Sequence, residues 1–290
     1  MKLLNRFSGV FDTLAKKIEQ AEVLDAAADP AAEGAGRLVS GPTVRSLLGG
    51  TPLGHPLHPL LVTVPIGAWA TAAALDALGN KPGARSAVGV GVLVAPLAAA
   101  AGVHDWATTQ GGERRVGWVH GLLNTVTLGL YAASWVARRR GNDRLGVLLT
   151  LPGLALLGTA GWLGGHLSYA RGVGVDVTAF EPEIPEWVDV AASTDVQHGQ
   201  LTGVSAEDTP VLLTRDADGT PRALADRCTH RGAPLHEGQV EDGCVRCPWH
   251  DSLFDLRSGT VVMGPASRPQ PVLEVSEREG RLLVRRPAGS

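Results

Sequence analysis

Two short segments near the carboxyl end of the chain combine cysteine and histidine at spacings that suit metal binding. Cys228 and His230 form a C-x-H motif, and after sixteen further residues Cys247 and His250 form a C-x-x-H motif. Two thiolates and two imidazoles can hold a structural zinc ion. Each motif, however, pairs one cysteine with one histidine, whereas a zinc ribbon usually contributes a C-x-x-C pair. The pattern therefore favours another metal centre, with a zinc site as the alternative.

The residues around these motifs resemble the Rieske [2Fe–2S] domain over about residues 186–290. Glycine and proline follow the motifs at turn-like positions, namely Gly232, Pro234, Pro248 and Gly264-Pro265. In that family two cysteines hold one iron and two histidines hold the other. The resemblance implies that Cys228 and Cys247 bind the inner iron and that His230 and His250 bind the outer, redox-active iron. It also implies that the Gly264-Pro265 loop covers the cluster.

The type of Rieske domain follows from residues near the motifs. The domains of respiratory complexes carry two further cysteines, whereas the corresponding positions here are Ala233 and Trp249. The resemblance is therefore to the ferredoxin-type domains that supply electrons to ring-hydroxylating oxygenases. Ser252 can donate a hydrogen bond to a cluster sulfur, but Phe254 stands where the high-potential type has tyrosine. Because such bonds raise the potential, we expect a midpoint potential near the lower end of the known range, about −150 mV.

The composition of the 290-residue chain indicates two domains, one of them in a membrane. A net charge of −3, without a basic stretch interleaved with aromatic residues, argues against nucleic-acid binding. Charged residues are almost absent from 59–80, 86–104 and 116–137. The third cysteine, Cys244, is interpreted as a buried strand thiol, so that no disulfide framework is left.

We predict a multi-domain protein, with an all-α four-helix transmembrane bundle followed by a small all-β antiparallel domain. Four apolar segments, each close to the roughly 20 residues that cross a bilayer, are expected at 59–78, 86–106, 116–136 and 145–167. The predicted parts are an amphipathic helix and linker at 1–50, the bundle at 51–170, an acidic linker at 171–186 and the Rieske domain at 187–290.

The amino-terminal segment has apolar residues at helical spacing together with several basic residues, which predicts an amphipathic helix over 1–25. This helix is expected to lie on anionic lipid, with packing against the rest of the protein as the alternative. Residues 26–50 are rich in alanine, glycine and proline and are expected to form a linker.

Five histidines lie near the ends of the predicted spans: His55, His58, His104, His120 and His166. With four spans, all five fall on one membrane face. Ionisable groups near the membrane are costly and tend to mark function, so we expect a shared haem or metal site there. Haem b between two helices is the preferred form, because a haem beside a Rieske centre makes a two-step electron path.

The helical part, about residues 50–170, opens with an H-P-x-H-P motif at 55–59. It resembles an uncharacterised family of small four-helix membrane proteins that are often joined to Rieske domains. That resemblance implies a fold and a membrane location but no activity.

These observations predict a membrane-anchored one-electron transfer protein with a [2Fe–2S] cluster. Its expected partners are the lipid bilayer, a reductase that donates electrons, since the chain has no G-x-G-x-x-G motif, and an acceptor that the sequence does not name. The alternatives are a membrane oxidoreductase with a second haem or metal site, or a redox or iron sensor, so enzyme activity is left open. We expect a multi-pass protein of the cell membrane. Its Rieske domain is expected to be cytoplasmic, because the missing disulfide cysteines suit a reducing compartment. The alternative is a Rieske domain outside, because the basic loop at Arg138, Arg139 and Arg140 is expected on the cytoplasmic side by the positive-inside tendency.

Overall fold

The computed structural model describes the backbone of residues 2–286 and the side chains of residues 9–286. The chain divides into two compact units. One consists of Met1–Ser40 and Leu57–Val173, and the other of Gly41–Pro56 and Gly174–Ser290. The carboxyl-terminal unit therefore includes a short segment from far upstream in the sequence. As a result, the chain passes from one unit to the other three times.

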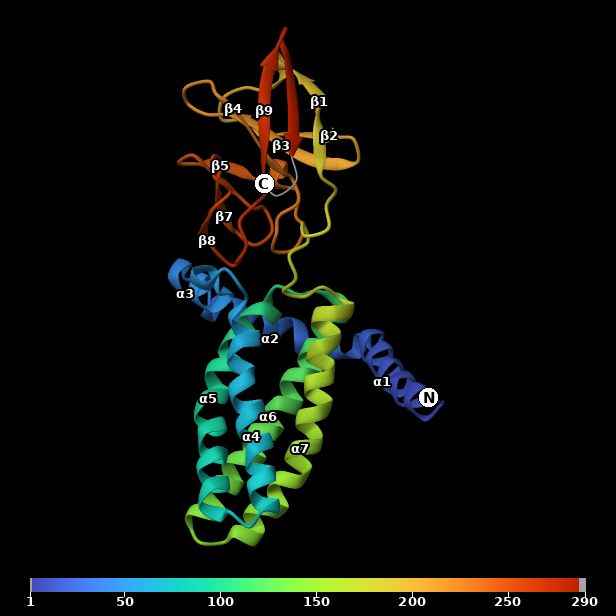
Figure 1. Cartoon of the computed structure of the whole chain (residues 1–290), viewed down its shortest axis with the longest axis vertical. Coiled ribbons are helices and arrows are strands. Elements are labelled where there is room, and N and C mark those ends of the chain that lie inside the picture. The colour runs from blue at the N-terminus through green and yellow to red at the C-terminus, as the bar shows by residue number, and fades with distance from the viewer. Residues whose placement is uncertain (1, 287–290) are drawn as a thin grey trace. The chain divides into compact units, whose positions relative to one another are not determined.

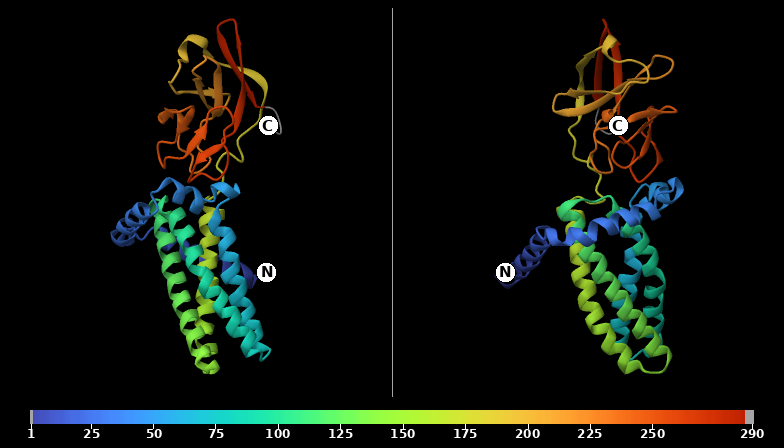
Figure 2. Two further views of the ribbon diagram at one scale, coloured as in Figure 1. Left: turned by 90° about the vertical axis from the view of Figure 1, so that its left-hand side faces the viewer. Right: turned by 180° about the vertical axis from the view of Figure 1, so that it is seen from behind.

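The helical unit is built around four long helices: α4 (Leu57–Ala77), α5 (Lys81–Ala107), α6 (Gly111–Arg139) and α7 (Asp143–Gly165). Figures 1 and 2 show them side by side as a bundle. Tight turns join α4 to α5 and α6 to α7. Gly79 and Gly141 adopt φ angles of 76° and 82° in these turns, a region that favours glycine. The side chains of Asn80 and Asn142 then cap α5 and α7.

The two helical hairpins, α4–α5 and α6–α7, repeat one another at a fixed offset of 62 residues. The offset relates Gly79 to Gly141 and Asn80 to Asn142 in the turns just described. It also relates Asp76 to Arg138, which bind each other across the bundle. The bundle is therefore an internal repeat of one hairpin, although few residue types are shared between the halves.

Three of the four helices are long and apolar enough to cross a membrane: α4, α5 and α7 with its extension to Ala170. Helix α6 is the longest, with 29 residues, but it does not meet that standard within the described chain. Its middle carries His120, Asn124 and Thr127. The expectation of four apolar spans is therefore confirmed for three helices.

The amino-terminal region is helical almost throughout: α1 (Lys2–Glu19), α2 (Asp25–Leu38) and α3 (Pro42–Gly49). The expectation of a linker at 26–50 is therefore wrong. Helix α2 buries Ala28 and Ala32 in the helical unit, because small residues allow close packing. Its acidic residues Asp25 and Asp29 bind Arg115 and Arg114 at the start of α6.

The second half of α1 packs against the bundle. The ring of Phe11 lies 5.2 Å from that of Trp162, and Glu19 binds both His166 and Arg171. This packing agrees with the alternative interpretation of the amphipathic helix. The basic residues Lys2 and Arg6, on which the lipid interpretation partly depends, lie outside the residues whose side chains are described.

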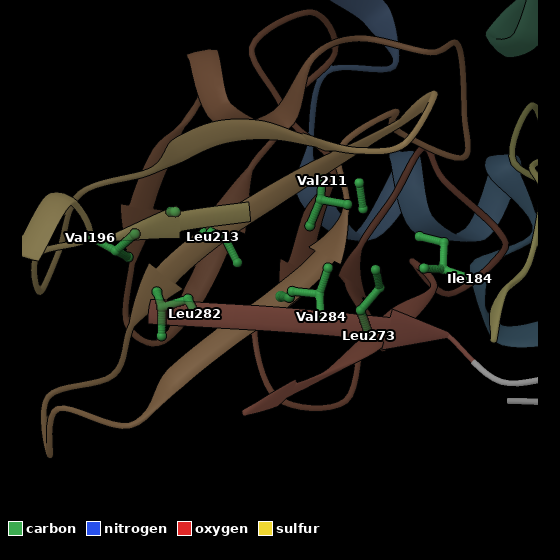
Figure 3. Packing of buried hydrophobic residues seen from close by; sticks show 10 residues of the cluster. Ile184, Val196, Val211, Leu213, Leu273, Leu282 and Val284 are labelled. Carbon is green, nitrogen blue, oxygen red and sulfur yellow. The ribbon is translucent and has the colours of Figure 1, made fainter. Parts of the chain in front are cut away.

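The second unit contains two antiparallel sheets. The six-stranded sheet has the order β1-β10-β9-β4-β3-β2. Its strands are β1 (Ile184–Ala192), β2 (Thr202–Ala206), β3 (Thr209–Arg215), β4 (Pro221–Ala225), β9 (Val272–Arg278) and β10 (Arg281–Arg286). Side chains from β1, β3, β9 and β10 gather in its core, as Figure 3 shows. A second apolar cluster, which includes Leu212, Leu224 and Phe254, contains the cysteines of the two loops that carry the predicted metal ligands.

The four-stranded sheet has the order β5-β6-β7-β8, from β5 (Gln239–Glu241), β6 (Cys244–Arg246), β7 (Leu253–Asp255) and β8 (Val261–Met263). Cys244 is buried on β6, in agreement with its interpretation as a strand thiol.

The predicted acidic linker at 171–186 is in part packed rather than solvated. Glu181 is buried beside Arg286, with 3.5 Å between its carboxylate and the guanidinium, and burial raises the pKa of this carboxyl. Strand β1 also begins at Ile184, before the predicted start of the domain.

Candidate metal centre

The four predicted Rieske ligands lie in two loops of the second unit. Cys228 and His230 follow β4, and Cys247 and His250 lie between β6 and β7. The thiols of the two cysteines form a hydrogen bond with each other. The rings of His230 and His250 lie with their centroids 5.0 Å apart and nearly perpendicular, at 86°. The structure thus brings sulfur beside sulfur and imidazole beside imidazole.

The two pairs differ in exposure. Each cysteine is only 1% exposed, whereas both imidazoles are half-buried. A dinuclear centre on these ligands would have one iron in the interior on sulfur and one towards the surface on nitrogen. The donor set and its burial therefore fit a [2Fe–2S] cluster of the Rieske type.

Backbone N–H groups surround both sulfurs. The N–H groups of His230 and Arg231 bond to the sulfur of Cys228. The thiol of Cys228 and the N–H groups of His250 and Trp249 lower the pKa of Cys247 to about 7, whereas the contact with Cys247 and burial raise the pKa of Cys228 well above its usual value. Both loops thus present donors that stabilise negative charge on sulfur, as iron–sulfur sites require.

Gln270 holds the first ligand loop in place, a role that the sequence analysis missed. Its side chain is 1% exposed, and its Nε2 donates to the carbonyls of Ala225 and Arg227 at 2.7 and 2.6 Å. Its Oε1 accepts from the N–H of Thr229 at 3.1 Å. The position of Gln270 between two prolines, just before β9, was the signal available in the sequence.

The two residues expected to set the potential lie beside the second loop. Ser252 is fully buried, and its Oγ accepts a hydrogen bond from the N–H of Ala266 at 3.0 Å. Phe254 is also fully buried, among the apolar residues beneath the ligand loops. A hydrogen bond from Ser252 to a cluster sulfur stays a prediction.

The upstream segment of the second unit, residues 41–56, packs on the ligand loops; we call it the α3 segment. Its polar contacts include Arg45 with Asp251 at 3.2 Å, Gly264 N–H to Ser46 Oγ at 3.1 Å, and Thr51 Oγ1 to the carbonyl of Ala266 at 2.8 Å. One contact lies next to His250 and two lie on the Gly264-Pro265 loop. The α3 segment is therefore part of the site, not a linker.

We predict that Gly264→Ala separates the α3 segment from the loop. A Cβ at this position would lie 2.6 Å from Thr51 Oγ1, which forces that side chain to move, and 3.1 Å from the backbone of Ser46, which is tighter than most Cβ contacts. Hydrogen–deuterium exchange of residues 42–56 is expected to rise about tenfold or more, corresponding to about 1.4 kcal/mol of opening free energy. Thr51→Ala alone is the control, because it removes the hydrogen bond to the carbonyl of Ala266 without adding a Cβ at Gly264. Unchanged exchange in Gly264→Ala would contradict the prediction.

Of the five histidines near the helix ends, the structure brings His58 and His120 together. The rings of His58 and His120 lie 6.5 Å apart, centroid to centroid. His166 bonds to Glu19 at 2.8 Å, His104 is buried on α5, and His55 belongs to the other unit, in the α3 segment. Within the described residues, no three His, Cys, Asp or Glu side chains converge on a site for one bare metal ion.

Comparison with known proteins agrees with both halves of the chain. Residues 186–275 match the Rieske [2Fe-2S] domain family. Residues 54–177 match the predicted membrane protein family DUF2231. The chain therefore belongs to the Rieske [2Fe–2S] family through its carboxyl-terminal domain, which follows a helical domain of a membrane-protein family.

The similar proteins narrow the type of Rieske domain. The anthranilate 1,2-dioxygenase ferredoxin subunit of Burkholderia cepacia is 33% identical over 104 residues, which is 36% of this chain and 95% of that protein. Ferredoxin CarAc of Metapseudomonas resinovorans is 31% identical over 98 residues, 34% of this chain and 92% of that one. The ferredoxin of carbazole 1,9a-dioxygenase from Nocardioides aromaticivorans IC177 has a TM-score of 0.33 and 26% identity, covering 34% of this chain and 97% of its own. The similarity to the first two of these proteins, both ferredoxins, confirms the expected ferredoxin type and supports a role in electron transfer.

Proposed function

We propose that this protein is a membrane-anchored one-electron carrier whose [2Fe–2S] cluster is held by Cys228, Cys247, His230 and His250. The observation that carries the proposal is the arrangement of the two ligand loops, with a buried pair of sulfurs and a half-buried pair of imidazoles. A bound cluster of this type supplies one-electron oxidation and reduction.

The exposure of the ligand residues determines on which side of the cluster an electron enters or leaves. The buried cysteines exclude water from the inner side, whereas the imidazoles reach the surface and offer the shorter route for an electron. Trp249 lies beside His250, with 6.5 Å between their ring centroids, and its side chain is 57% exposed. An exposed aromatic side chain next to the outer ligand suits transient contact with a redox partner.

The donor is proposed to be a reductase, by analogy with the dioxygenase ferredoxins to which the domain is similar. The acceptor is a redox protein or an enzyme that docks on the same imidazole face. The three apolar helices support anchoring in a bilayer.

We propose that the Rieske domain faces the cytoplasm. Ala233 and Trp249 stand where the respiratory-complex type carries its two disulfide cysteines, which suits a reducing compartment. Protease treatment of intact, right-side-out cells is expected to leave the domain uncut. Loss of the domain under that treatment would place it outside.

The carrier function is tested on the purified full-length protein. We expect two iron and two labile sulfide per chain. We also expect one redox centre that a ferredoxin reductase reduces and that a one-electron acceptor such as cytochrome c oxidises. A colourless protein with one zinc and no sulfide would overturn the proposal. A cluster that exchanges no electrons with any reductase would favour a redox or iron sensor instead.

Phe254→Tyr is expected to raise the midpoint potential. A hydroxyl that donates to the cluster region and gains about 1 kcal/mol on reduction shifts a one-electron couple by about 40 mV. Potentiometric titration of the wild type is expected near −150 mV, at about the lower end of the Rieske range, with the variant more positive. Phe254→Leu is the control, since it changes packing without adding a donor. A lower potential in the tyrosine variant would contradict the prediction.

The second candidate function is a membrane oxidoreductase with a further haem or metal site in the bundle. The observation that favours it is the approach of His58 and His120 to 6.5 Å. A haem or stoichiometric metal beyond the cluster iron would support this candidate over the simple carrier.

A further inference from the structure

We propose that His58 and His120 are the two axial ligands of a haem b bound within the helical bundle. This site lies in a different unit from the Rieske ligands and goes beyond the carrier function. Of the five histidines predicted to share a site, only these two are proposed as ligands.

The internal repeat relates His58 to His120, as it also relates His104 to His166, and a ring contact is found for the first of these pairs. His120 lies 62 residues after His58, the same offset that relates Asp76 to Arg138. Tyr131 lies at that offset from Trp69, and their rings stack with centroids 4.1 Å apart and planes 2° from parallel. Residues at the same position of two repeats touch each other only near the axis that relates the repeats. His58 and His120 are a third such pair, so their site lies on the axis of the bundle.

The hydrogen bonds of both imidazoles leave the same nitrogen for a metal. Nδ1 of His58 lies 2.8 Å from the carbonyl oxygen of Ala98, and Nδ1 of His120 lies 2.8 Å from that of Ala160. Because a carbonyl can only accept, each Nδ1 carries the proton and each Nε2 carries a lone pair. Metal-binding histidines are oriented in this way, with the far N–H donated to a backbone carbonyl.

The contact of Asn124 with His120 agrees with this tautomer. The amide nitrogen of Asn124 lies 3.1 Å from Nε2 of His120 and, as a donor, requires an acceptor there. Asn124 is the group that a metal would replace at this nitrogen.

The separation of the rings fits two ligands of one metal ion. At about 2.0–2.1 Å per metal–nitrogen bond, imidazoles on opposite sides of an ion have centroids about 6.3–6.5 Å apart. The observed separation is 6.5 Å, with the planes at 82°.

The number of ligands points to haem and not to a bare ion. Structural zinc takes four protein ligands, and non-haem iron usually takes three. Within the described chain no third His, Cys, Asp or Glu joins this pair. A porphyrin brings four nitrogens of its own and needs the protein only for the axial positions.

Two glycines allow the rings to approach the neighbouring helices. A Cβ at Gly102 would lie 2.7 Å from Cε1 of His58, and a Cβ at Gly164 would lie 3.0 Å from Cε1 of His120. These glycines are again 62 residues apart. Glycine at the same position of both halves thus lets His58 pack closely against α5 and His120 pack closely against α7.

The test uses the full-length protein, produced with a haem precursor and purified in detergent. We expect a Soret band, the sharp α and β bands of a low-spin ferrous haem with two nitrogen ligands, and one haem per chain by the pyridine assay. His58→Ala and His120→Ala are each expected to weaken haem binding at least about tenfold. His55→Ala, in the other unit, is the matched control and is expected to keep the spectrum.

Two further measurements keep the proposal falsifiable. If an alanine variant does not fold, His58→Met is expected to retain haem with an altered axial ligand and a shifted spectrum. The cluster signal in electron paramagnetic resonance is expected to persist in all these variants, so loss of haem is distinguishable from failure of the carrier function. A protein without a Soret band, a bare metal bound at the pair, or a low-spin spectrum that survives His58→Ala/His120→Ala would overturn the proposal.

Discussion

Cys228→Ala is expected to abolish cluster binding. The side chain is 1% exposed and supplies one of two sulfurs that meet beneath the imidazoles, and no other cysteine can replace it without moving a strand. Iron and labile sulfide are expected to fall from about two each per chain, the content of a [2Fe–2S] cluster, to background, with loss of the visible absorbance and of the paramagnetic signal on reduction.

Cys244→Ala is the matched control for this change. Cys244 is also buried, but it lies on β6 and its sulfur contacts the carbonyl of Asp242 at 4.0 Å. We expect this variant to keep full iron and sulfide. Equal loss of iron in both variants would mean that a cysteine was needed for folding only, whereas retention of the cluster in Cys228→Ala would refute the ligand assignment.

The ligand motifs were predictable from the sequence because the chemistry depends on residues close together in the chain. A Cys and a His two or three positions apart must share a loop, and two such loops define the donor set. The supports of these loops were not predictable in this way. Gln270 supports the first loop from about forty residues after Cys228. The α3 segment contacts the second loop from about two hundred residues before Asp251. No local sequence pattern identifies such distant partners.

In the helical half of the chain, residue composition alone does not predict which segments are helices and which helices are apolar. The alanine-rich residues 26–50 were expected to be a linker, yet Ala28 and Ala32 are buried because small side chains fit between helices. Helix α6 was expected to resemble the other spans, yet His120 and Asn124 lower its hydropathy for the sake of contacts inside the bundle. Membrane face alone groups all five histidines together. The 62-residue offset, which the two G-N turns mark in the sequence, is the feature that pairs His58 with His120.

Arg138→Met is expected to destabilise the bundle strongly. The guanidinium is fully buried and makes two bonds to the Asp76 carboxylate, at 2.7 and 2.6 Å, and a third to Ser134 at 3.1 Å. Methionine leaves Asp76 as a buried charge without its partner, which typically costs about 3–5 kcal/mol. The pair joins α4 to α6 and so links the two repeats. Thermal unfolding followed by circular dichroism in mild detergent is expected to fall by about 10 °C or more.

Two controls separate the lost charge pair from lost packing. Asp76→Leu/Arg138→Met removes both charges, and we expect it to recover most of the stability, because replacing a buried pair with apolar residues is often nearly neutral. Lys81→Ala breaks the ion pair between Lys81 and Asp143, which are also 62 residues apart and join the two hairpins. In this pair the charged atoms are 3.6 Å apart and the lysine side chain is 66% exposed. An exposed pair of this kind contributes at most about 1 kcal/mol, so this variant is expected to unfold close to the wild type. If Arg138→Met unfolds at the same temperature as Lys81→Ala, the two repeats are held together by apolar packing, and the buried ion pair is not what joins them.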